Sequence, residues 1–244
     1  MLRFKRILFV IFVAIFPVAV AFQLVFPNGR PVFLPAQTHG PVLIIDAGHG
    51  GEDGGAISRS GVLESHLNLA IAQRLELILG LFATPVTMLR QEDVSLHDSH
   101  CKTLREKKVS DLHNRVKLVS QQANGVLLSI HQNSFPSERF SGAQVFFAPT
   151  DGSQALANAM QTTLRFAIDP ANSRQAAAIA KGVYLMNHIT CPAILVECGF
   201  LTNPAEEQRL QEAAYQTKLA AAMAGCWLNY RGTEPLQDRE EGIH

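Results

Sequence analysis

The chain has 244 residues, a formal net charge of zero at pH 7 and 47% hydrophobic residues. This length fits one domain with a core of ordinary size. Because nucleic-acid binding usually needs a basic surface, the neutral composition argues against a nucleic-acid partner.

The amino-terminal segment departs from globular composition. Arg3, Lys5 and Arg6 precede an uncharged, mostly apolar run over residues 7–26. A run of about 20 apolar residues is long enough to cross a bilayer as a helix, and the basic flank predicts a cytoplasmic amino end. An uncleaved membrane anchor is the favoured interpretation, and a cleaved secretory signal stays open. Either one, over residues 1–27, places the rest of the chain outside the cytoplasm.

The rest of the chain divides into three parts. Residues 28–40 contain prolines and glycines and are expected to form a linker. Residues 41–231 form the predicted catalytic domain, and residues 232–244 form a polar tail.

Strand and helix patterns alternate through the predicted domain. Apolar runs predict strands over residues 42–46, 85–89, 126–130, 142–148 and 193–197. Helical spacing and cap residues predict helices over 63–79, 111–123 and 153–166, within 175–187, and from 204 to 230. The polar stretch 92–108 is expected to be a surface loop. This alternation predicts an α/β fold with helices on both faces of a sheet.

Residues of the kinds that bind metals follow three of these strands. The segment VLIIDAGHGGEDGG supplies His49, LLSIHQNS supplies His131 and ILVECGF supplies Glu197. If the strands are neighbours, these side chains converge at one edge of the sheet. Glu64, in the first turn of the following helix, is a fourth candidate, although a carboxylate there also stabilises the helix dipole.

Two histidines and one carboxylate with an open water position form a known catalytic zinc arrangement. A further carboxylate then serves as general base. The hypothesis is a metal hydrolase with His49, Glu64 and His131 as ligands and Glu197 as base. The helical signature HExxH is absent, and a polar loop histidine is the alternative interpretation of His49.

Four separated motifs carry a resemblance to a known family: DAGHGGEDGGA, Glu64 with Asn68, SIHQNS, and VECGFLTNPAE. In this order they resemble the zinc N-acetylmuramoyl-L-alanine amidases, which cleave bacterial cell wall. The resemblance implies Zn²⁺ held by His49, Glu64 and His131, with Glu197 as the catalytic carboxylate. It also implies a three-layer fold with a mostly parallel six-stranded sheet between helices. Ala47 departs from the proline that is usual at its position.

Within that family the stretches SLHDSHCKTLREKKVSDLHNRVKLV, GAQVFFA and GVYLMNHIT are similar to germination-specific cortex amidases of endospore formers. This similarity implies hydrolysis of the bond between N-acetylmuramic acid and L-alanine in peptidoglycan, in spore cortex and in muramic-lactam formation. Two alternatives stay open. One is a zinc peptidase that acts on stem peptides, and the other is an amidase-like protein that is active only with a partner protein.

The remaining candidates are expected to be structural. Arg90 and Arg115 could touch an anionic stem peptide, but structural ion pairing is the preferred interpretation. Cys198 and Cys226 lie in apolar runs and are predicted to be small buried residues, while the pairing state of the four cysteines cannot be deduced. Five histidines lack convergent partners: His66, His97, His100, His113 and His188.

Overall fold

The computed structural model describes residues 40–232. The signal or anchor expected over 1–27, nearly all of the linker and nearly all of the polar tail therefore lie outside the described residues. Within 40–232, none of the helices has the length and hydrophobicity that a membrane span requires.

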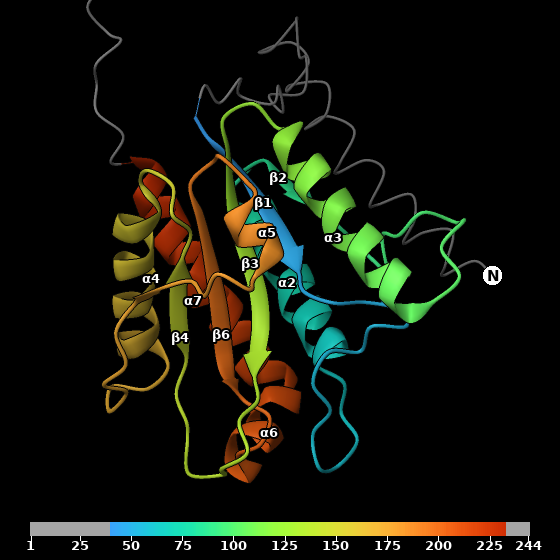
Figure 1. The fold of residues 1–244 in the computed structure, drawn as a ribbon. Helices are drawn as coiled ribbons and strands as arrows, with labels where there is room; N and C mark the ends of the chain where they lie inside the picture. The colour runs from blue at the N-terminus through green and yellow to red at the C-terminus, as the bar shows by residue number, and fades with distance from the viewer. Residues whose placement is uncertain (1–39, 233–244) are drawn as a thin grey trace, which may run out of the picture. The chain divides into compact units, whose positions relative to one another are not determined.

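Six strands form one mixed sheet in the order β2-β1-β3-β6-β4-β5 (Figure 1). The pairings of β1 (Val42–Ala47) with β2 (Val86–Met88) and β3 (Gly125–Asn133), and of β3 with β6 (Ala193–Phe200), are parallel. β4 (Gln144–Phe147) pairs antiparallel with β6 and parallel with β5 (Ala177–Ala178). The predicted α/β class with a mostly parallel six-stranded sheet is confirmed.

Helices cover both faces of this sheet. One core joins the sheet to α2 (Glu64–Leu81), α4 (Ser153–Ala167) and α7 (Ala213–Gly232), and it contains Leu43 and Ile45 of β1. The other joins it to α3 (Leu104–Ser120) and α5 (Tyr184–Asn187), and it contains Ile44. Because successive side chains of a strand point to opposite faces, this alternation produces the three predicted layers (Figure 1).

The main difference from the sequence expectation is the start of α3. The sequence predicts a loop through residue 108 and a helix from residue 111, but the helix begins at Leu104. The Thr103 hydroxyl accepts from the Glu106 N–H at 3.2 Å, and the Glu106 carboxylate accepts from the Thr103 N–H at 2.9 Å. This capping box stabilises a first turn that has no apolar periodicity, so the periodicity did not reveal it.

Other elements differ in length. β3 includes His131 and β6 continues beyond Glu197, whereas we predicted shorter strands. The segment 175–187 contains β5 as well as the four-residue helix α5. The C-terminal helical stretch is two helices, α6 (Pro204–Gln211) and α7, which are divided at Glu212.

A buried ion pair joins α3 to β1. The Arg115 residue is 2% exposed, and its guanidinium donates to Asp46 and to Asp111, the latter at 2.7 Å. Asp46 also accepts from the Ser129 hydroxyl at 2.6 Å. Burial opposes ionisation of Asp46, but the Arg115 guanidinium and the Ser129 hydroxyl hold its pKa below the ordinary value. The structural ion pairing predicted for Arg115 is confirmed.

Replacing Arg115 by methionine should lower the free energy of unfolding by about 3–5 kcal/mol, because Asp46 stays buried without its charge partner. Urea unfolding at pH 7, followed by circular dichroism, measures this change. Lys117→Met, at an exposed position of the same helix, is the control and should change stability by less than about 0.5 kcal/mol. An Arg115→Met protein as stable as the wild type would contradict the prediction.

Candidate metal centre

The three predicted ligands come from different elements and meet at the carboxyl edge of the parallel strands. His49 follows β1, Glu64 begins α2 and His131 lies near the end of β3. One donor atom from each lies within 4.8 Å of the others. His49 Nε2 is 3.4 Å from Glu64 Oε2, and His131 Nδ1 is 2.9 Å from Glu64 Oε1. The Glu64 carboxylate therefore lies between the two imidazoles.

The loop that carries His49 is held by two buried arginines. His49 has a φ of 62°, a left-handed conformation that residues other than glycine rarely adopt. Arg115 Nη2 donates to the His49 carbonyl at 2.7 Å. Arg90 donates to the carbonyls of Ala47 and Gly48 at 2.8 and 3.1 Å. Two guanidinium groups thus bind three consecutive carbonyls and fix the unusual backbone that presents His49.

Two glycines of this loop leave room for the ligands. A Cβ at Gly48 would lie 2.2 Å from the His131 ring, and a Cβ at Gly55 would lie 2.6 Å from Glu64 Oε2. A side chain at either position would displace a predicted ligand. The glycines therefore permit the close approach of the three donors.

Hydrogen bonds orient the ligands further. Asp53 Oδ2 accepts from His49 Nδ1 at 2.9 Å, which leaves Nε2 to face Glu64. Glu64 Oε1 accepts from Asn68 Nδ2 at 3.3 Å and from the Gln132 N–H at 3.1 Å. Contacts of this kind fix the tautomer and orientation of metal ligands in proteins.

The charges of the group favour a cation between the ligands. Burial opposes protonation of His49, but hydrogen bonds to Asp53 and Glu64 outweigh it and raise the pKa of His49 to about 9. Burial would raise the pKa of Glu64, but His131 and His49 hold it well below its ordinary value. A metal ion competes with the proton for His49, because a histidine must be neutral to bind it.

Glu197 lies beside this group. It pairs in register with His131 across β6 and β3. Its Oε2 is buried and has no hydrogen-bond partner among the described residues. Burial, with a smaller contribution from the negative Glu64, raises the pKa of Glu197 to about 7. A carboxyl group with a pKa near neutrality and a free oxygen suits proton transfer at pH 7.

The residues present fit a zinc ion. Two imidazoles and one carboxylate are the donor set of several catalytic zinc sites, whereas Mg²⁺ and Ca²⁺ prefer oxygen donors alone. Glu197 is outside the set of mutually close donor atoms. Its unpartnered buried oxygen is therefore available to a substrate or a water rather than needed as a fourth ligand.

The other candidates lie outside this group. His66 Nε2 is 3.0 Å from Asp93 at the surface, and the His188 ring stacks on Tyr184. All four cysteines are free, and Cys198 and Cys226 are buried as predicted.

Sequence reasoning missed the residues that support the ligands. Asp53 lies four positions after His49 in the same glycine-rich loop, and a carboxylate so close to a candidate ligand is the signal that could have revealed it. Arg115 and the His49 carbonyl are 66 positions apart, and Arg90 and the Gly48 carbonyl are 42 positions apart. No local pattern predicts such contacts between a side chain and a distant backbone group.

Comparison with known proteins connects this geometry to a family. Residues 43–226 match the family model of N-acetylmuramoyl-L-alanine amidases. The chain is 35% identical over 202 residues to the germination-specific N-acetylmuramoyl-L-alanine amidase of Bacillus subtilis (strain 168), covering 82% of this chain and 83% of that protein. It is 27% identical over 232 residues to the N-acetylmuramoyl-L-alanine amidase AmiA of Escherichia coli (strain K12), covering 78% of this chain and 75% of that protein.

A solved structure agrees with these matches. The CwlD amidase of Clostridioides difficile, in complex with the GerS lipoprotein, superposes with a TM-score of 0.76 at 32% identity, covering 80% of this chain and all of that chain. The chain therefore belongs to the N-acetylmuramoyl-L-alanine amidase family, and the enzyme class that the sequence motifs imply is confirmed.

Proposed function

We propose that this amidase is a zinc enzyme with His49, Glu64 and His131 as ligands and Glu197 as the catalytic carboxylate. It hydrolyses the amide bond between N-acetylmuramic acid and L-alanine in peptidoglycan, outside the cytoplasm, and residues 41–231 form its catalytic domain. The observation that supports this proposal most strongly is the grouping of the three donor side chains beside the buried carboxyl group of Glu197, one oxygen of which has no hydrogen-bond partner among the described residues.

A zinc ion held by these ligands supplies Lewis acidity, which makes water nucleophilic near neutral pH. Glu197 accepts one proton from the attacking water, and the hydroxide adds to the lactyl carbonyl of N-acetylmuramic acid. As the carbon–nitrogen bond breaks, Glu197 returns the proton to the amine of L-alanine. The second proton of the water leaves the new lactyl carboxyl group for the amine or for solvent, so the glycan keeps a lactyl carboxylate and the peptide leaves with its amino group free of the glycan. Asp53 and Asn68 keep His49 and Glu64 in place during this step.

His49→Ala should abolish stoichiometric zinc binding, because it removes one of three ligands. Loss of an outer-shell partner lowers metal affinity by about 10–100-fold, and loss of a ligand should lower it further. Zinc titration against a chromogenic chelator measures it. His66→Ala, whose ring contacts Asp93 at the surface, should bind zinc as the wild type does. Full zinc occupancy in His49→Ala would refute the ligand role.

Glu197→Gln should bind zinc normally but hydrolyse peptidoglycan about 10²–10⁴-fold more slowly, because an amide cannot accept the proton from water. Mass spectrometry of released peptides that begin with L-alanine measures the rate. Glu212→Gln, at an exposed position between α6 and α7, is the matched control. Near-normal turnover by Glu197→Gln would remove this residue from the mechanism.

The substrate is proposed to be spore cortex. Similarity to the germination-specific amidase of B. subtilis supports this choice. Incubating the full chain with cortex and, separately, with vegetative peptidoglycan shows which wall type it cleaves, and cortex should be cleaved faster. The products also separate an amidase from a zinc peptidase, because the peptidase leaves L-alanine attached to the glycan.

Dependence on a partner protein is the second candidate. The CwlD amidase was solved in complex with a lipoprotein, which supports an activating partner for this chain as well. The isolated chain would then bind zinc without cleaving cortex, and adding a lipoprotein from the same cell envelope would restore cleavage. The proposed location is extracytoplasmic, either anchored in the membrane by the amino-terminal segment or secreted.

A further inference from the structure

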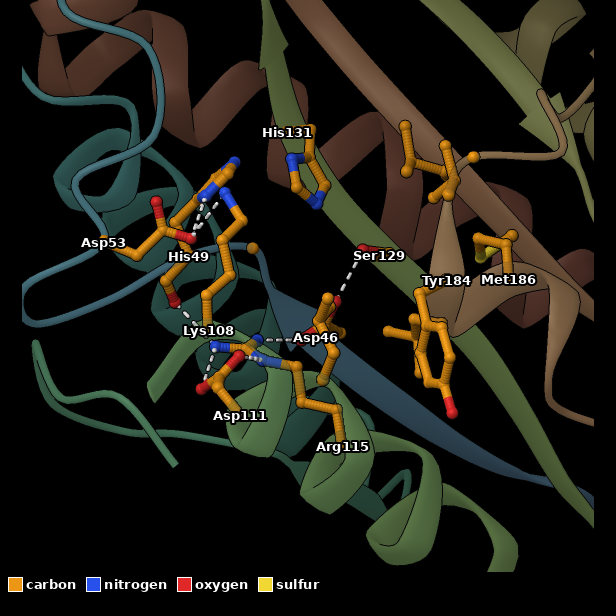
Figure 2. Close-up of a pocket in the computed structure, with 16 residues that line it drawn as sticks. Asp46, His49, Asp53, Lys108, Asp111, Arg115, Ser129, His131, Tyr184 and Met186 are labelled. Atoms are coloured by element: carbon orange, nitrogen blue, oxygen red, sulfur yellow. Dashed lines mark hydrogen bonds and ion pairs between the residues drawn. The ribbon is translucent and has the colours of Figure 1, made fainter. Parts of the chain in front are cut away.

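A recess of about 250 Å³ lies beside the proposed ligands, on the face of the sheet that α3 and α5 cover (Figure 2). Asp46, Ser129 and Leu195 line it, and they are aligned in register across β1, β3 and β6. His131 and Glu197 are two positions further along β3 and β6, so they point to the same face. The recess therefore adjoins His131 and Glu197, the residues proposed to act on the substrate.

The opposite walls are apolar and aromatic. Tyr184 and Met186 of α5 lie across the recess from His49 and Asp53 (Figure 2), and Leu112 of α3 and Leu185 of α5 also line it. The volume is below the about 300–1,000 Å³ of pockets for drug-sized ligands, so the recess suits a short segment of a substrate. An alanine methyl group would pack against such a wall without leaving a polar group unpaired.

The carboxylates of the recess are already bonded to protein donors. Asp111 accepts from Arg115 and from the Leu96 N–H, and Asp46 and Asp53 each accept from two side chains. Their oxygens therefore offer little to a ligand.

Lys108 has donors that no acceptor among residues 40–232 is recorded to use. Its Nζ is 3.3 Å from Asp53 Oδ2, and its side chain is 55% exposed at the edge of the recess (Figure 2). An ammonium group has three donors, and Asp53 is its acceptor among the described residues. The remaining donors are available to a ligand carboxylate.

We infer that this recess receives the first residues of the departing peptide and that Lys108 is a specificity-determining residue that binds a carboxylate next to L-alanine. The inference rests on the proposed function, because that reaction releases a peptide whose first residue is L-alanine. The ligand is thus an acidic peptide with an apolar first residue.

Two glycan substrates test this inference. They carry the same muramoyl-L-alanyl peptide, and the α-carboxylate of the second residue, D-glutamate, is free in one and amidated in the other. The wild type should show an about tenfold lower KM for the free carboxylate, which corresponds to about 1.4 kcal/mol. Lys108→Met should bring the two KM values together, and Lys108→Arg should restore the preference, because binding alone is affected.

Lys107→Met is the matched control. Lys107 is adjacent in α3, pairs with Glu52 and does not line the recess, so this variant should keep the preference. If Lys108 acted only through Asp53 on His49, Lys108→Met would lower kcat equally for both substrates and weaken zinc binding. That result, or an unchanged preference in Lys108→Met, would overturn the inference and leave the amidase proposal intact. Cleavage of neither substrate by zinc-loaded wild type, with or without the added lipoprotein, would overturn both.

Discussion

The arrangement of the candidate site depends on the buried guanidinium of Arg115. This one group bonds to Asp46 in β1, to Asp111 in its own helix and to the backbone carbonyl of His49. A buried charge without such partners is strongly unfavourable, so α3 packs where all of these acceptors are within reach. The same packing places the first turns of α3 beside the loop that carries His49, where Lys108 contacts Asp53.

The site lies across the end of the sheet rather than on one face. Ile130 belongs to the core beneath α2, so its neighbour His131 points to the side of α3 and α5. Glu64, at the start of α2, reaches the same point from the other side. The proposed ligands from the two layers meet at the carboxyl edge of the sheet, where a side chain at Gly48 or Gly55 would collide with His131 or Glu64.

The sequence predicted the parts that depend on local chemistry. A strand followed by a glycine-rich turn located His49, and the Asn203–Pro204 pair located the start of α6, where the Asn203 side chain accepts two backbone N–H groups. The start of α3 escaped prediction because its first turns are polar and charged. The contacts of Arg90 and Arg115 with backbone carbonyls were not predicted, because every residue has a backbone carbonyl and the sequence does not show which one an arginine will contact.

The distance along the chain between the proposed ligands has a consequence for the order of assembly. Glu64 and His131 are 67 positions apart, and they meet only after β1 and β3 have paired in parallel. Pairing of distant segments is slow, and an unfolded chain offers no preformed metal site. In small zinc modules the ion and the fold arrive together. Here two apolar cores hold the sheet on both faces, so the fold does not depend on the proposed metal, which would bind after folding.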